Sequence, residues 1–112
     1  MTETEEIDLG KEEPAHLINQ NGLSQLFANR VRARFIVTLF YADEPLTIAE
    51  IANAVGMTQT VTHQAKQQLQ KFDILEVTTR EDGKEVFHLR EDDELVTHLR
   101  TVAELATERF YE

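Results

Sequence analysis

The stretch from Thr47 to Leu69, TIAEIANAVGMTQTVTHQAKQQL, constrains the fold of this chain more than any other. Thr47 is a good N-cap residue and Glu50 follows three positions later, which is the capping-box pattern that opens a helix. Gly56 suits the left-handed conformation that ends a helix, and Thr58 can cap the next one. The stretch therefore predicts two short helices joined by a tight turn.

The sequence on either side of this pair extends the pattern. Apolar residues recur every three or four positions from Leu23 to Tyr41, which predicts a preceding helix that ends before Pro45. The later runs ILEVTTR and KEVFHLR are rich in strand formers, and the Asp-Gly pair between them predicts a hairpin. A last helix is expected from Asp92 or Asp93 to about Tyr111. The order α-α-α-β-β-α indicates a winged helix-turn-helix, a mainly α fold with a small β-hairpin (α+β).

The chain is expected to divide into three parts. Residues 1–13 hold few apolar groups and many acids, so they predict a disordered acidic arm. Residues 14–91 would form the winged helix-turn-helix domain, which a short helical turn from Pro14 to Gln20 opens. Residues 92–112 would form a C-terminal dimerisation helix.

An apolar seam at heptad-like spacing supports the role given to the last helix. Since the three-helix unit has its own core, this seam is expected to pair two copies of the chain about a two-fold axis, together with the first helix. The alternative is that it packs back on the first helix of its own chain. The seam consists of Leu95, Leu99, Val102, Ala106 and Phe110.

The charge of the chain lies mainly at its ends. The 112 residues include 21 acids and 11 bases, for a net charge of −10; the charge is −5 over residues 1–20, −5 over residues 91–112 and zero between them. Abundant carboxylates with few lysines suit a protein that stays hydrated in a salt-rich cytoplasm, where charge repulsion is strongly screened. The alternative is an ordinary acidic protein.

Other composition features exclude several classes of protein. The chain has no cysteine, which rules out disulfides, thiolate metal sites and thiol redox sensing. It has no apolar run of membrane-spanning length and no signal peptide, so a cytoplasmic location is expected and no membrane partner. It also lacks a phosphate-binding glycine loop, a nucleophile elbow and an HExxH motif, so we expect neither an enzyme nor a cofactor.

The helix after Thr58 carries the strongest functional signal. None of residues 51–72 is acidic, although acids are frequent in the chain as a whole. Val61, Ala65, Leu69 and Phe72 are expected to pack on the domain, which leaves an amide-rich surface. Gln can bind adenine through N6 and N7, and a Thr methyl can contact a thymine methyl. The alternative is that these amides only keep a surface helix soluble.

These considerations give a predicted DNA-contact set. The residues predicted to contact base edges are Gln59, Thr60, His63 and Gln64. The residues predicted to contact the DNA backbone are Thr47, Thr58, Thr62, Lys66, Arg30, Arg34, Arg80 and Lys84. Arg32 belongs to the same basic cluster as Arg30 and Arg34, and the sequence does not decide which of the three contacts DNA. Asp82 would repel phosphate and is expected to serve the hairpin turn instead.

Residues Leu26 to Leu89 resemble the ArsR/PadR-type winged helix-turn-helix transcription regulators of prokaryotes. FANRVRARFIVTLF is similar to their first helix, LTIAEIANAVGM to their second, TQTVTHQAKQQL to their reading helix and REDGKEVFHL to their wing. The main departure is Ala65, where the family usually carries a leucine. Together with the acidic composition, the resemblance is nearest to haloarchaeal regulators similar to RosR, which implies a response to stress or oxidant.

The resemblance and the seam together imply a homodimer on double-stranded DNA with a near-palindromic site. Because the chain is so acidic, cations are expected to bridge its carboxylates to the DNA. Two other readings remain open. One is a winged-helix module that binds protein through its acidic faces and does not read DNA. The other is a metal sensor that uses Glu94 and His98, which lie four residues apart on the last helix. Whether such a regulator represses or activates, and which operator and inducer it has, is not encoded in any residue pattern.

Overall fold

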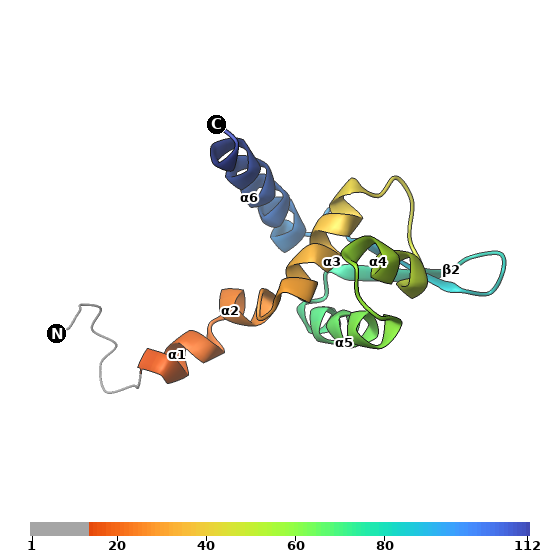
Figure 1. The fold of residues 1–112 in the computed structure, drawn as a ribbon, viewed down its shortest axis with the longest axis horizontal. Coiled ribbons are helices and arrows are strands. Elements are labelled where there is room, and N and C mark those ends of the chain that lie inside the picture. The colour runs from red at the N-terminus through yellow and green to blue at the C-terminus, as the bar shows by residue number, and fades with distance from the viewer. Residues whose placement is uncertain (1–13) are drawn as a thin grey trace.

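Three helices and a hairpin form the body of the protein, and a helical segment extends from it at each end (Figure 1). The computed structural model describes residues 14–112, so the predicted arm of residues 1–13 lies outside it. In chain order the elements are α1 Pro14–Gln20, α2 Gly22–Leu26, α3 Arg30–Tyr41, α4 Ile48–Val55, α5 Gln59–Leu69, the 3₁₀ helix η1 Gln70–Phe72, β2 Leu75–Thr79, β3 Glu85–Leu89 and α6 Glu94–Phe110. This is the predicted winged helix-turn-helix, with α3, α4 and α5 as its three helices and β2–β3 as its wing.

The first predicted helix is in fact two helices. The pattern from Leu23 to Tyr41 predicted one continuous helix, but α2 ends at Leu26 and α3 begins at Arg30. Asn29 causes the break because its side-chain oxygen accepts a hydrogen bond from the Arg32 amide at 3.0 Å and so caps α3. Apolar spacing persists through the break, which is why the sequence pattern concealed it.

The helix-turn-helix is built as its capping residues predict. The Thr47 hydroxyl accepts from the Glu50 amide at 3.1 Å, and the Glu50 carboxylate accepts from the Thr47 amide at 2.9 Å, which completes the capping box. Gly56 ends α4 with a φ of 76°, in the left-handed region. Thr58 then caps α5 by accepting from the Val61 amide at 3.2 Å. These local bonds fix the angle at which α5 leaves α4.

The wing is an antiparallel hairpin in which Leu75 pairs with Leu89 and Thr79 with Glu85. Arg80 and Lys84 close the loop between the strands, and Gly83 within it has a φ of 86°, as expected for a turn followed by a left-handed residue. The predicted role of Asp82 is confirmed because its carboxylate accepts from the Lys84 amide at 2.9 Å. Leu46 pairs with Phe87 as an isolated bridge, which ties the start of the helix-turn-helix to the wing.

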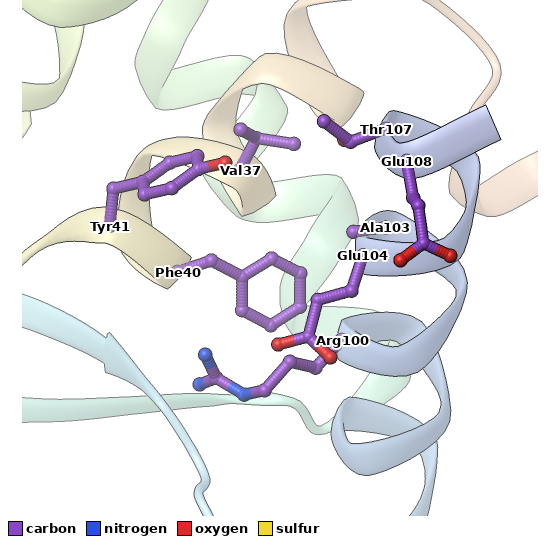
Figure 2. A pocket seen from close by; sticks show the side chains of 8 residues that line it. All are labelled: Val37, Phe40, Tyr41, Arg100, Ala103, Glu104, Thr107 and Glu108. Carbon is purple, nitrogen blue, oxygen red and sulfur yellow. The ribbon is translucent and has the colours of Figure 1, made fainter. Parts of the chain in front are cut away.

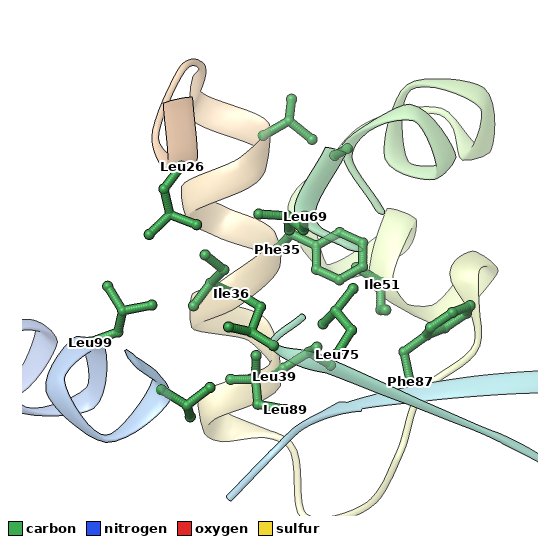
Figure 3. Close-up of a cluster of buried hydrophobic side chains, with 14 of the residues drawn as sticks. Leu26, Phe35, Ile36, Leu39, Ile51, Leu69, Leu75, Phe87, Leu89 and Leu99 are labelled. Atoms are coloured by element: carbon green, nitrogen blue, oxygen red, sulfur yellow. The ribbon is translucent and has the colours of Figure 1, made fainter. Parts of the chain in front are cut away.

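One hydrophobic core joins the three helices, the wing and the start of α6 (Figure 3). Phe35, Ile51 and Leu69 come from α3, α4 and α5, and Phe87 comes from β3; each is at most 1% exposed. Val96 and Leu99 of α6 join the same cluster. The prediction that Leu99 belongs to a dimer seam is therefore wrong, because it is 7% exposed and packs within its own chain.

Beyond Leu99, α6 leaves the body of the protein (Figure 1). Its later apolar side chains are exposed, with Val102 at 59% and Phe110 at 79%. The alternative that α6 packs back on the first helix of its own chain thus holds for its first two turns only. Within residues 14–112, no helix combines the length and the apolar character that a membrane span requires.

Candidate nucleic-acid interface

The predicted packing face of α5 is partly confirmed, because Ala65 and Leu69 are buried and Phe72 packs against the core. Val61 was expected inside but is 36% exposed, whereas Thr62 and Lys66 lie in the interior. Thr62 can be buried because its hydroxyl donates to the Thr58 carbonyl oxygen at 2.8 Å. The Lys66 ammonium lies 5.6 Å from the centre of the Phe87 ring, a cation–π contact that holds the side chain against the wing. The packing face consists of Thr62, Ala65, Lys66 and Leu69.

Three residues predicted to contact the DNA backbone are largely buried in the structure. Thr62 is fully buried and Lys66 is 8% exposed, so neither side chain is free on the surface of α5. Thr47 is 7% exposed, and its hydroxyl is engaged in the capping box. Thr58 is exposed at the start of α5 and stays in the predicted set.

Four exposed polar residues lie along the outer side of α5 and the 3₁₀ helix that follows it. Thr60, Gln64 and Gln67 follow one another at spacings of four and three, which places them on one side of α5, opposite the packing face, and Lys71 follows in η1. We call these four residues the α5 ridge. The predicted base contacts Gln59 and His63 are also exposed and flank it. The predicted set of DNA contacts did not include Gln67 or Lys71.

The acid-free character of α5 extends across a neighbouring part of the molecule. Residues 14–42 contain no Asp or Glu, a second run that the sequence analysis overlooked. This run supplies α1, α2 and α3, and the start of α3 lies beside α5: a hollow of about 390 Å³ is lined by Asn29, Arg32, Gln64 and Gln68, among others. In a chain of net charge −10, two acid-free segments thus line the same hollow.

The three arginines of α3 differ in their surroundings. Arg32 is partly buried, and its Nη1 donates to the Gln25 carbonyl oxygen at 2.5 Å, which turns it toward α2. Arg30 and Arg34 are exposed. The cluster that the sequence left undecided therefore offers Arg30 and Arg34 to a partner, while Arg32 joins α2 to α3.

Arg80 at the base of the wing is already paired. Its Nη2 donates to Glu50 Oε1 at 3.0 Å and to the Pro45 carbonyl oxygen at 3.3 Å. The hydrogen bonds from Arg80 and from the Thr47 amide lower the pKa of Glu50 from 4.5 to about 2. Lys84, on the other side of the same loop, is exposed. Of the two predicted wing contacts, Arg80 would have to break its bonds to Glu50 and Pro45 before it could bind a phosphate. The Lys84 side chain is exposed.

A second hollow lies between α3 and α6, with a volume of about 370 Å³ (Figure 2). Its walls are mainly apolar and include Val37, Phe40 and Ala103, and Arg100 lies 4.6 Å from the centre of the Phe40 ring. On the same helix, His98 and Glu94 approach to 3.8 Å. Among residues 14–112 no group of three or more His, Asp or Glu side chains could hold a metal ion, so the metal-sensor reading gains no support.

Comparison with known proteins supports the fold. No protein-family profile matches the sequence. No curated protein sequence matches it either. MepR of Staphylococcus aureus, a transcription regulator of the multidrug efflux pump MepA, matches with a TM-score of 0.62 and 15% identity over 87% of this chain and 75% of MepR. MepR has also been solved in complex with DNA.

Two further solved structures share this fold, and one of them is an enzyme. The homodimeric winged helix-turn-helix DNA-binding domain of Mb0332 from Mycobacterium bovis, described as a possible ArsR-family transcriptional regulator, matches with a TM-score of 0.57 and 22% identity over 90% of this chain and 95% of that one. Human N-acetylserotonin methyltransferase matches with a TM-score of 0.51 and 23% identity, over 72% of this chain and 25% of the enzyme. At these identities the comparisons show the winged-helix fold, and function must be argued from the site.

Proposed function

We propose that this protein is a homodimeric transcription regulator that binds double-stranded DNA in a sequence-specific manner. The observation that carries the proposal is the α5 ridge, which is exposed, rich in amides and free of carboxylates in an acidic chain. The exposed helix α6, by contrast, carries Glu94, Glu104 and Glu108. The absence of carboxylates from the α5 ridge avoids repulsion by the phosphates that line a DNA groove.

The ridge would lie in the major groove. Gln64 and Gln67 can each bind an adenine edge through the side-chain amide, with Thr60 against a thymine methyl and Lys71 near the phosphates. Gln59 and His63 would contact bases from the flank. Backbone contacts would come from Thr58, Arg30, Arg34 and Lys84, which remain exposed around the ridge.

Selection from fragmented genomic DNA tests this function directly. The protein is expected to enrich a small set of fragments that share a near-palindromic sequence, because two copies place two ridges about one helical turn apart. Sequencing of the bound fragments at moderate and at molar salt provides the readout. If the bound pool matches the input pool at both salt concentrations, the protein does not read DNA, and a protein-binding module that uses the acidic α6 becomes the better proposal.

We also propose that the protein works in a salt-rich cytoplasm, as a regulator similar to RosR with a role in stress response. The net charge of −10 and the presence of only four lysines support this. Cations would then bridge carboxylates to phosphates, so few direct phosphate pairs would form. The dependence of DNA affinity on salt concentration should consequently be shallow, with a slope well short of about −6.

The two-fold dimer would form through the part of α6 that leaves the body of the protein. Of the predicted seam, Leu95, Val102, Ala106 and Phe110 are exposed and remain proposed interface residues. The exposed Leu105 and Tyr111 extend the apolar surface. In the neighbour Mb0332 the winged-helix domain is homodimeric, which supports a homodimer here.

Val102→Glu is expected to weaken the dimer at least about tenfold, because a carboxylate would be buried in the interface without a partner. Thr101→Glu adds the same charge at the adjacent exposed position and serves as the control. Sedimentation equilibrium of both variants measures the effect, and circular dichroism confirms that each is folded. If the two variants dimerise equally, the interface lies elsewhere.

A further inference from the structure

Glu50 links two parts of the molecule that are distant in sequence. It occupies the first turn of α4, where its carboxylate accepts from the Thr47 amide at 2.9 Å. The same carboxylate accepts from Arg80, with Nη2 at 3.0 Å from Oε1 and Nη1 at 3.4 Å from Oε2. A single side chain thus completes a helix cap and also holds a guanidinium from the wing.

Arg80 forms hydrogen bonds through both its backbone and its side chain. Its backbone closes the wing loop, since its amide donates to the Lys84 carbonyl oxygen at 2.8 Å and its carbonyl oxygen accepts from the Gly83 amide at 2.9 Å. Its side chain reaches past Glu50 to the Pro45 carbonyl oxygen at 3.3 Å. The wing loop is therefore joined through Arg80 to the segment that leads into the helix-turn-helix.

The pair has a well-defined geometry. A bidentate arginine–carboxylate pair fixes the orientation of both groups, and its two hydrogen bonds here, at 3.0 and 3.4 Å, are about as long as the screening length of about 3 Å in molar salt. The pKa of Glu50 is about 2, so the carboxylate stays ionised well below neutral pH. The two side chains are 45% and 32% exposed, so the contribution of the pair to stability is modest and falls as salt rises.

We propose that the Glu50–Arg80 pair is a latch that fixes the wing relative to α4 and α5, so that Arg80 is a positioning residue and does not contact phosphate. The proposal rests on the DNA-binding function for its biological meaning, but the latch itself is a property of the free protein. With the wing held in place, the ridge and the wing loop would meet the DNA as one preformed surface. Less conformational freedom would then be lost on binding.

Two substitutions separate the latch from the helix cap. Glu50→Gln preserves the capping box, because glutamine accepts the same hydrogen bond, but it removes the charge that holds Arg80. Arg80→Lys keeps the positive charge and removes the bidentate geometry. Lys84→Gln is the control, since Lys84 belongs to the same loop and is exposed.

Hydrogen exchange of the hairpin, residues 75–89, in the free protein is the first measurement. Glu50→Gln and Arg80→Lys are each expected to raise the exchange rate of the loop amides about two- to fivefold, as befits a partly exposed ion pair, while Lys84→Gln leaves the rate unchanged. If both latch variants exchange like the original protein, the latch does not exist. This result is independent of DNA, so it stands even if the protein binds none.

DNA affinity as a function of salt is the second measurement. If Arg80 positions the wing, Glu50→Gln should lower affinity about two- to fivefold and leave the salt slope unchanged, whereas Lys84→Gln should make the slope shallower by about one unit. If instead Arg80 is a phosphate contact held back by Glu50, Glu50→Gln should raise affinity and steepen the slope. That outcome would overturn the proposal.

Discussion

Replacing Gln64 and Gln67 together by alanine is expected to weaken binding to operator DNA at least about 30-fold. Each bidentate contact to a base edge contributes about 1–3 kcal/mol of discrimination, so the loss of two removes at least about 2 kcal/mol. Both side chains are exposed, and the Gln67 side-chain amide approaches His63 Nε2 at 3.4 Å. The fold should therefore be unaffected, and the loss should fall on specific binding far more than on binding to random DNA.

Fluorescence anisotropy with operator DNA and with a scrambled duplex of equal length measures the two affinities. Gln20→Ala is a matched control because it removes the same side chain from an exposed position on α1. If the double variant loses affinity equally for both duplexes, the amides contribute no base recognition. If it loses none, the ridge is only a solubilising surface and the proposed function fails with it.

The local elements of the fold were readable from the sequence because their signals are local. The capping box of Thr47 and Glu50, the left-handed Gly56 and the Asp-Gly turn of the wing each depend on a few adjacent residues, and the structure confirms all of them. The Asn29 cap is also a local signal. It was not recognised, because the apolar spacing on both sides of Asn29 predicted one continuous helix.

The sequence does not show which side chains of α5 are buried, because contacts with other elements decide this. Thr62 and Lys66 look like surface residues in the sequence. They are buried because the helix itself satisfies the threonine hydroxyl and because the Phe87 ring, from a different element, receives the lysine ammonium. The pairing of Arg80 with Glu50 was equally invisible, since the two residues lie 30 positions apart. These contacts determine which polar groups are free to meet DNA.

Phe87→Ala is expected to destabilise the protein by about 3–5 kcal/mol, a large part of the 5–15 kcal/mol that holds a typical small domain together. The Phe87 ring is 1% exposed, and its backbone forms both hydrogen bonds of the bridge to Leu46, at 2.8 and 3.1 Å. Removal of the ring would leave a cavity where β3 meets α4 and α5. It would also leave the Lys66 ammonium without the aromatic face that now accepts it.

Urea unfolding of Phe87→Ala and of Val77→Ala tests this argument. Val77 is the cross-strand partner of Phe87 in the hairpin, yet it is 40% exposed, so its loss should cost less than about 1 kcal/mol. Similar midpoints for the two variants would mean that the ring does not anchor the wing. If the predicted difference is found, the wing, the buried Lys66 and α5 depend on one aromatic side chain. The orientation of the α5 ridge then depends on the hairpin that follows it in sequence as much as on the helix that precedes it.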